Sequence, residues 1–502
     1  LSVNTSGASN VAIGSGALIA NTTGTQNNAV GSGALDANTT ASFNTAMGHN
    51  ALGANTTGAG NTALGQTALT ANTTGAQNVG IGAGAGGAVT TAVNSTFVGY
   101  VSGGATTTGA TNTGLGWSAF ASNTTGAENV AVGGQALAAN TTASNNTAIG
   151  RSALVANTTG ANNTAVGKDA GKALTVGNSN TAVGQNALAL DTQGDLNTAI
   201  GIGALQSQNF TSSTDSYNTA VGGFAGGSNT TGQNNTFVGG LAGNKNTTAD
   251  NNTAVGYHAG TAMTTGDTNS AFGKDALVTC TTGTNNSAIG SRALNDLTSA
   301  TNNAALGDLA GENITTGSNN TTIGVGCNAI TTTGENVTMV GHLCRASGAT
   351  VSNEVVIGSN GMIGKGASTA FISGGNGPVY AGNNATAFSQ TSDRRIKKDI
   401  IPNNKGLESI KQIEPKYFYY KSDEEMQAEL PDAQEGLPLD KQFTSAIAQE
   451  LKEIFPEAVE ERTKNNILSV NTDPIFWSMV NAIKELSAKN DALEARLTTL
   501  EG

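Results

Sequence analysis

The residues best suited to chemistry lie in one short basic segment, 392–400, which reads SDRRIKKDI. It places a serine hydroxyl five residues before a lysine amine. A serine hydroxyl is a poor nucleophile without a base, and a lysine whose amine is desolvated can serve as that base, as in Ser-Lys hydrolases. The competing interpretation is a solvated basic turn, because Arg394, Arg395, Lys397 and Lys398 can simply be surface charges. Taken alone, the segment favours that second interpretation.

A second stretch shifts the balance and carries a family resemblance. Residues 446–451 read AIAQEL, and residues 455–459 read FPEAV. Together with segment 392–400 they resemble the intramolecular chaperone auto-processing domain of phage tail spikes, endosialidases and tail fibres. That family's pattern, Ser-Asp-x-Arg-x-Lys-x-x-Ile, is met here at every fixed position, and the resemblance covers roughly residues 389–502.

The resemblance implies roles for four residues. Ser392 would be the nucleophile and Lys397 the base, and the chain would be cut between Ser392 and Asp393. Asp393 and Arg395 would position the reacting segment. The implied activity is that of a serine peptidase acting only on its own chain. Whether the cut is made stays open, because such a domain can also be retained.

The last part of the chain predicts a long helix with an apolar seam. Apolar residues there follow alternating spacings of three and four, which is the heptad pattern of a coiled coil. The seam consists of Phe476, Met479, Ile483, Leu486, Asn490, Leu493, Leu497 and Leu500. Asp473-Pro474 is a plausible helix start, and Asn490 would set register and oligomeric state. The alternative is one amphipathic helix packed on its own domain. Resemblance to phage fibres implies a homotrimer.

Most of the remaining chain repeats with a period of 17 residues. Glycine recurs at every step from Gly14 to Gly201, is four residues late at Gly222, and then continues to Gly358. This gives 21 glycines in phase with one insertion, which chance does not produce. We therefore reject disorder in favour of a repeat architecture.

The residues around each repeat glycine predict a strand-rich coil. The preceding residue is apolar and mostly β-branched, the one before that is usually alanine, and asparagine stands four before in all but three units (Ser95, Val337 and Glu354). β-Branched residues favour strands, whereas Gly, Asn and Thr disfavour helix. One repeat per coil gives a parallel β-solenoid with coils about 4.8 Å apart, roughly 100 Å long in all.

Each repeat position then has an expected place in the coil. We expect the large apolar residue before the glycine to point inward, beside a small alanine in a narrow interior. The glycine should mark a bend or a close backbone approach. The repeated asparagine should form a hydrogen-bonded ladder and tolerate a left-handed turn. The Asn-Thr-Thr-Gly unit should make the second turn of the coil.

Such a coil has a thin core, so we expect chains to associate side by side. Units such as Asn-Thr-Ala-Val-Gly resemble the repeats of trimeric autotransporter adhesin heads, which are left-handed parallel β-rolls packed as trimers. This resemblance covers about residues 10–360, although those heads commonly use a shorter repeat. The fold class is therefore mainly β: a solenoid shaft at 1–365, a joint at 366–388, a small α+β chaperone domain at 389–475, and a coiled-coil helix at 476–502.

Composition excludes several functions. Residues 1–365 and 366–502 each carry a net charge of -6 (8 − 14 and 15 − 21), so no basic stripe supports nucleic-acid binding. No apolar run approaches the roughly 20 residues of a membrane span. Cys280, Cys327 and Cys344 form no disulfide framework. Cys327 and Cys344, one repeat apart, either stack on neighbouring coils or are simply small buried thiols. No cysteine or histidine has zinc-type spacing, and we expect no cofactor or metal.

The sequence thus predicts a structural fibre or adhesin on a virion tail or an extracellular surface, which holds a host surface glycan or receptor. It begins at Leu1 without a methionine or a signal peptide, as a fragment or processed form would. The candidate receptor contacts, unless they are tolerated decoration, are the insertion with Phe210, Thr211, Asp215 and Tyr217, and the aromatic residues Tyr100, Trp117 and Tyr257.

Two other functions are weighed against attachment. Threonine pairs from Thr22-Thr23 to Thr73-Thr74 could form the hydroxyl array of an ice- or surface-binding solenoid, but we expect that array to break down after about the fourth coil. A glycan-degrading fibre would need a general acid/base pair. The shaft carboxylates are sparse and make no such pair, for example Asp169, Asp191, Asp195 and Asp215.

Overall fold

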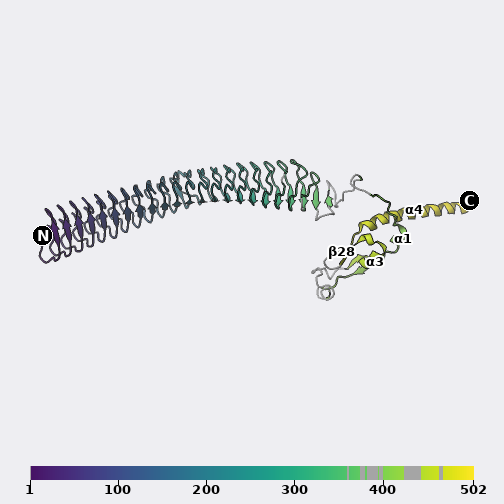
Figure 1. Cartoon of the computed structure of the whole chain (residues 1–502), viewed down its shortest axis with the longest axis horizontal. Helices are drawn as coiled ribbons and strands as arrows, with labels where there is room; N and C mark the ends of the chain where they lie inside the picture. Colours follow the sequence, from purple (N-terminus) through teal and green to yellow (C-terminus); the bar gives the residue numbers. More distant parts are fainter. Residues whose placement is uncertain are drawn as a thin grey trace. The chain divides into compact units, whose positions relative to one another are not determined.

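The computed structural model describes residues 2–328, 330–358, 361–372, 379–381, 394, 399–422, 425, 442–462 and 467–501. The chain divides into two compact units, residues 1–391 and residues 392–502. The first unit contains the shaft, a stack of regular coils, and the second is a small domain with a long helix (Figure 1). Among the described residues, no helix has both the length and the apolar character needed to span a bilayer.

The shaft is built from short strands that recur once per coil. They are β1 (Val11–Ile13), β2 (Asn28–Val30), β3 (Thr45–Met47), β4 (Thr62–Leu64), β5 (Val79–Ile81), β6 (Thr96–Val98), β7 (Thr113–Leu115), β8 (Val130–Val132), β9 (Thr147–Ile149), β10 (Thr164–Val166), β11 (Thr181–Val183), β12 (Gly194–Asp195), β13 (Thr198–Ile200), β14 (Thr214–Asp215), β15 (Thr219–Val221), β16 (Thr236–Val238), β17 (Thr253–Val255), β18 (Ser270–Phe272), β19 (Ser287–Ile289), β20 (Ala304–Leu306), β21 (Thr321–Ile323), β22 (Thr338–Val340), β23 (Val355–Ile357), β24 (Ala370–Ile372) and β25 (Val379–Ala381).

The pairing of these strands confirms one 17-residue repeat per coil. β1 pairs in parallel with β2 so that Ala12 lies opposite Ala29, and the later parallel pairs up to β22–β23 keep this 17-residue offset, except β13–β15. The strands from β1 to β25 other than β12 and β14 form one 23-stranded sheet. At its C-terminal end β25 pairs antiparallel with β24, so the last pairing of the sheet differs from the parallel stack before it.

The prediction that the large apolar residue of each strand points inward is wrong. Ala29 and Ala46, at the middle of their strands, are fully buried, whereas Ile13 is 60% exposed and Met47 48% exposed. Successive side chains of a strand face opposite sides, so an inward alanine forces both of its neighbours outward. In coils whose opposite wall supplies a leucine, such as Leu35, the interior has room only for alanine at the middle of the strand.

The buried leucines of that opposite wall adopt an unusual backbone conformation. They stand four residues after the repeat glycine, and Leu18, Leu35 and Leu52 have φ of 49°, 54° and 53°. The left-handed conformation disfavours a side chain by about 1–2 kcal/mol, which the burial of a leucine, about 1.5–3 kcal/mol, offsets. Where another large side chain enters the core, glycine replaces this leucine, as Gly226 and Gly243 do beside Phe237.

This exchange of volume predicts a compensating pair of substitutions. Phe237→Ala should destabilise the shaft by about 3–5 kcal/mol, because it leaves a cavity in a closed core. A Cβ at Gly243 would overlap the Phe237 ring, so Gly243→Leu alone should also destabilise. The double variant F237A/G243L recreates the common coil and should recover most of the loss in denaturant unfolding. A double variant less stable than F237A would contradict this account of the core.

The predicted asparagine ladder runs along the shaft, and a second asparagine ladder accompanies it. In the first, the Asn27 backbone N–H donates to Asn10 Oδ1 at 2.9 Å, and Asn27 Nδ2 donates to the Ala41 carbonyl at 2.9 Å. In the second, Asn38 Nδ2 donates to Asn21 Oδ1 at 2.9 Å. The first ladder does not use left-handed asparagines; the residue before each of them, such as Gln26, has positive φ instead. The ladders satisfy polar groups that burial would otherwise penalise.

Threonine hydroxyls form a further ladder. Thr22 Oγ1 donates to the Thr39 carbonyl at 3.1 Å, and Thr332 Oγ1 still donates to the Ala349 carbonyl at 3.3 Å near the end of the shaft. The expectation that the array ends after about the fourth coil is therefore wrong. These threonine hydroxyls donate their protons to carbonyl groups of the next coil, so they cannot also donate them to an ice crystal or another outside surface.

The cysteines lie in the shaft interior. Cys327 and Cys344 occupy the alanine position three residues after the repeat glycine on neighbouring coils, and all three cysteines are fully buried. Burial raises the pKa of the Cys280 thiol to about 11 and that of Cys327 to about 12. Small buried thiols that fill the core account for these positions.

The second unit is a small α+β domain. Its elements are α1 (Leu407–Ile410), β26 (Lys416–Phe418), β27 (Phe443–Ser445), α3 (Ala448–Ile454), η2 (Pro456–Ala458), β28 (Val459–Arg462), β29 (Ile467–Val470) and α4 (Asp473–Glu501). β26 pairs antiparallel with β27, and β28 with β29. Leu451, Phe455, Ala458 and Val459 form its core. Helix α4 begins at Asp473 as predicted, and Ser478 and Ala482 on its first half are buried.

Candidate functional site

The four residues with predicted catalytic roles, Ser392, Asp393, Arg395 and Lys397, lie outside the described residues. Arg394, within the same segment, is described and is exposed. The proximity of the serine and lysine therefore stays a prediction from sequence. What the structure does place is the second stretch of the family pattern and the helix that follows it.

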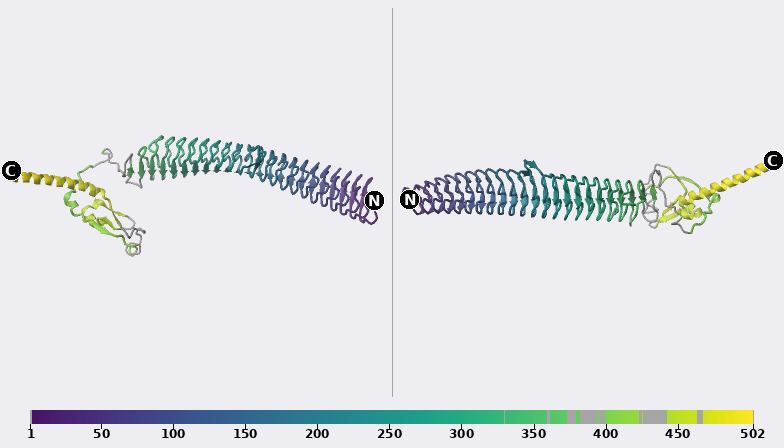
Figure 2. Two further views of the ribbon diagram at one scale, coloured as in Figure 1. Left: turned by 180° about the vertical axis from the view of Figure 1, so that it is seen from behind. Right: turned by 90° about the horizontal axis from the view of Figure 1, so that it is seen from above.

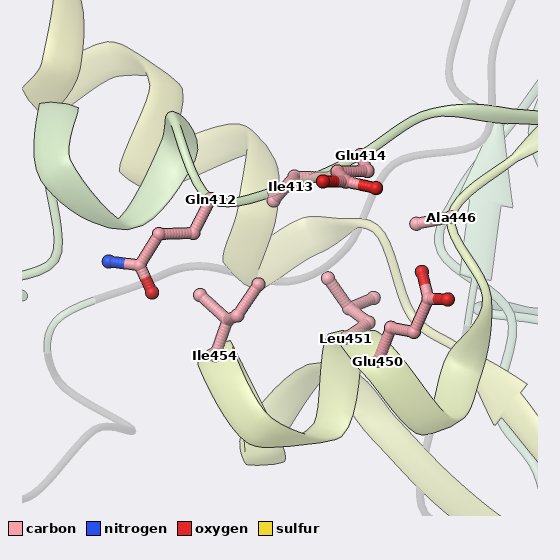
Figure 3. Close-up of a pocket in the computed structure, with 7 residues that line it drawn as sticks. All are labelled: Gln412, Ile413, Glu414, Ala446, Glu450, Leu451 and Ile454. Carbon is pink, nitrogen blue, oxygen red and sulfur yellow. The ribbon is translucent and has the colours of Figure 1, made fainter.

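The second stretch lines a cavity of about 300 Å³ in the C-terminal unit. Figure 3 shows α3 on one side and the segment that follows α1 on the other. Its lining consists of Gln412, Ile413, Glu414, Ala446, Glu450, Leu451 and Ile454. Residues 446–451 thus contribute both to this cavity and, through Leu451, to the core of the unit.

Charge at this cavity is concentrated on two carboxylates and one amine. Lys416 Nζ lies 2.6 Å from Glu414 Oε2 and 3.9 Å from Glu450 Oε2. The hydrogen bond from Lys416 holds the pKa of the Glu414 carboxyl below its usual range, and the same bond raises the pKa of Lys416. The lining side chains include no hydroxyl, thiol or imidazole. The polar groups that line the cavity are therefore the Glu414 and Glu450 carboxylates and the Gln412 amide.

Helix α4 is fixed to the unit by its first half. Asn481 Nδ2 donates to the carbonyls of Asn403 and Lys405 at 2.8 and 3.1 Å, and the Leu407 N–H donates to Glu485 Oε2 at 2.9 Å. Between α1 and α4 lies an apolar cavity of about 230 Å³. The unit thus holds α4 in a set orientation. The first half of the helix packs on its own domain, which is the alternative that the sequence left open.

The seam of α4 nevertheless stays uncovered. Its apolar members are Phe476, Met479, Ile483, Leu486, Leu493, Leu497 and Leu500, with exposed fractions of 42–82%, and Asn490 between them is exposed too. A single amphipathic helix packed on its own domain would bury such a stripe. The seam is therefore available to another chain.

The outward face of the shaft sheet is the second uncovered apolar surface. It is formed by the first and third residues of each strand from β1 to β23, except β12 and β14; we call it the outward face. These strands contain no charged residue, and their outward residues are mostly Thr, Val, Ile or Leu. Coils about 4.8 Å apart make the face roughly 100 Å long. Monomeric proteins rarely expose apolar patches larger than a few hundred Å².

Sequence reasoning missed the outward face, although a signal for it was present. Most coils carry alanine at the centre of the strand and, four residues after the glycine, commonly leucine or glycine. A narrow interior accepts only one large residue per coil. If the leucine is taken as the large buried residue of the coil, the β-branched residue before the glycine must lie on the outer face of the strand.

Comparison with protein families finds a match within the C-terminal unit. Residues 392–460 match the family described as the chaperone of endosialidase. The match starts at the serine of the basic segment and ends within β28, so it includes the lined cavity and the core of the unit. This domain, behind a β-solenoid shaft of about 21 coils, fits a tail-fibre or endosialidase-type protein.

Proposed function

We propose that this chain, which ends in a chaperone-of-endosialidase domain, is a structural fibre of a phage tail or a cell surface that attaches to a host surface glycan or receptor. The observation that carries the proposal is the outward face, an uncharged surface on every coil. Such a face suits side-by-side packing of identical shafts. A lone shaft would leave it in water at a large hydrophobic cost.

Homotrimerisation is part of the same proposal. The outward face and the α4 seam are both apolar and lack a partner within the described chain. Packing between copies of the chain would cover both surfaces at once. The number of copies, three, is what the resemblance to phage fibres implies. The C-terminal unit would align three chains before the shafts pair. This addresses a physical problem, because identical coils can pair in many registers.

Self-cleavage completes the proposed sequence of events. Once the three chains are aligned, Ser392 Oγ attacks the carbonyl carbon of the Ser392–Asp393 bond, and Lys397 takes the hydroxyl proton and passes it to the Asp393 nitrogen, which leaves as an amine. Water then hydrolyses the serine ester, which restores the hydroxyl and releases the shaft with a carboxylate at Ser392. Removal of the aligning domain would leave a fibre that unfolds slowly, because its folding partner is no longer attached.

Mass analysis of the expressed chain tests this proposal. The wild type should separate into fragments 1–392 and 393–502, whereas Ser392→Ala and Lys397→Ala should stay at full length. Lys398→Ala removes a neighbouring amine and should still be cut. Light scattering of the uncut Ser392→Ala protein should give three times the chain mass of 49.8 kDa. A full-length wild type refutes self-cleavage alone, and a monomeric mass refutes the trimer alone.

A further inference from the structure

One coil of the shaft differs from all its neighbours in length. The interval from Gly201 to Gly222 is 21 residues instead of 17, yet β13 and β15 pair in the usual register. The four extra residues are therefore absorbed outside the sheet, in residues 209–215, which we call the slip loop. In the right-hand view of Figure 2, a teal loop projects from the row of coils at this level.

A buried carboxylate fixes the start of the slip loop. Asp191 is fully buried at the position that an asparagine of the second ladder occupies in other coils, such as Asn140 and Asn157. It accepts hydrogen bonds from the N–H groups of Gly194 and Phe210 at 3.0 and 3.1 Å, and from Gln208 Nε2 at 2.7 Å. Phe210 is only 6% exposed, so it serves as an anchor and not as a sugar platform. Any contact with a ligand must therefore come from the exposed residues in and beside the slip loop.

A second carboxylate fixes the end of the slip loop. Asp195 is 7% exposed and accepts hydrogen bonds from the Asn178 N–H at 2.5 Å and from Ser213 Oγ at 2.8 Å. β12 and β14 pair beside it, which places Asp195 opposite Asp215. Buried carboxylates are unfavourable unless fully hydrogen-bonded. A loop held at both ends in this way is preorganised, which lowers the entropy lost on binding.

An aromatic ring lies directly after the slip loop, beside a carboxylate and several hydroxyls. Tyr217 is 53% exposed, and its hydroxyl donates to Asp215 Oδ2 at 3.4 Å. Leu196, 40% exposed, occupies the same repeat position on the adjacent coil. Both adopt positive φ, 47° and 60°, at a position where most coils have a polar residue or glycine. Thr211, Ser212 and Ser213 are exposed nearby. Tyrosine with serine and asparagine is the composition of recognition loops.

Charge around the slip loop selects the ligand class. Residues 173–244 contain no Lys, Arg or His, whereas Asp191, Asp195 and Asp215 all lie in this stretch. An anionic ligand such as a phosphate or a sialic acid would meet no cation to pair with. Sugars without charge have an apolar C–H face and a rim of hydroxyls. An amphipathic aromatic ring and a carboxylate can match these two surfaces.

We propose that the slip loop, with Tyr217 and Leu196, is a binding site for a neutral oligosaccharide. Tyr217 stacks on the apolar face of one sugar ring, while Asp215 and the loop hydroxyls exchange hydrogen bonds with the sugar hydroxyls. The inference rests on the proposed role in attachment, and it specifies a ligand without charge.

The test uses the full chain on an array of neutral and sialylated oligosaccharides, followed by titration calorimetry with the neutral compound that binds best. Tyr217→Ala should weaken that binding at least about tenfold, which corresponds to about 1.4 kcal/mol. Phe43→Ala is the matched control, because Phe43 is 63% exposed and occupies the same repeat position as Tyr217, but on the coil of β3, far along the shaft from the slip loop. It should bind as the wild type does. Circular dichroism should show that both variants fold.

Three results would overturn the site: no neutral compound bound, sialylated compounds preferred, or equal binding by Tyr217→Ala and the wild type. Light scattering of the same samples keeps the two proposals separate. A trimer that binds nothing refutes only the sugar site, and a monomer that binds through Tyr217 refutes only the trimer.

Discussion

Replacing Gly222 with alanine is expected to destabilise the shaft severely, whereas the same change at the next residue, Gly223, is expected to have almost no effect. Gly222 has a φ of 137°, which L side chains rarely adopt. A Cβ there would lie 2.5 Å from the carbonyl oxygen of Gly239 and 2.6 Å from its carbonyl carbon. These are backbone atoms of the next coil, so they cannot move away as a flexible side chain would.

The size of the effect follows from two separate terms. Strain at such a φ contributes about 1–3 kcal/mol, and overpacking contributes about 1–3 kcal/mol more, so the total is about 2–6 kcal/mol. A Cβ at Gly223 would have no atom within 4 Å, so alanine there should change stability by less than about 0.5 kcal/mol. Denaturant unfolding followed by circular dichroism measures both. Equal losses in the two variants would refute the close approach of the coils.

Placing lysines on the outward face is expected to prevent the shafts from pairing. The triple variant Leu115→Lys, Val132→Lys and Ile149→Lys puts three charges on the outward face of consecutive coils. In a packed fibre each would be buried without a partner, at several kcal/mol per ion. In a separate chain all three would be solvated, since Leu115 and Ile149 are 47% and 40% exposed. The effect should therefore fall on assembly and not on the folding of each coil.

A second triple variant serves as the control. Thr125→Lys, Thr142→Lys and Thr159→Lys place the same charges on exposed turn positions of the same coils. Because α4 can still hold three chains at their ends, both the molar mass and the midpoint of thermal unfolding should be measured. The turn variant should match the wild type in both, whereas the face variant should lose mass or unfold at a clearly lower temperature. Identical behaviour of the two triples would rule out the outward face as the interface.

The period of the shaft could be predicted from sequence because glycine is required for a physical reason at one position of every coil. The direction of each side chain could not be predicted in the same way. A three-residue strand such as β1 shows that Ala12 and Ile13 face opposite sides, but not which of them faces in. That choice depends on the opposite wall, where the left-handed Leu18 supplies the large buried residue. Leucine with positive φ is not a pattern that propensity alone suggests.

The slip loop shows the same limit. The broken spacing predicts an insertion between Gly201 and Gly222, and the structure has one. The broken spacing does not reveal that Phe210 is buried, because its burial depends on hydrogen bonds that Asp191 accepts from residues up to 19 positions away. For Ser392 and Lys397 the sequence carries the whole argument, since both lie outside the described residues.

The hydrogen bonds between coils have a mechanical consequence. Strands of neighbouring coils pair side by side, so their hydrogen bonds run along the length of the shaft. Tension between the two ends of a single shaft would therefore load these bonds one coil at a time, and the outermost coil would peel off first. Each coil released adds 17 residues of extended chain, or roughly 50 Å of length. A shaft under load would yield in small steps that absorb energy and would reform when the tension falls.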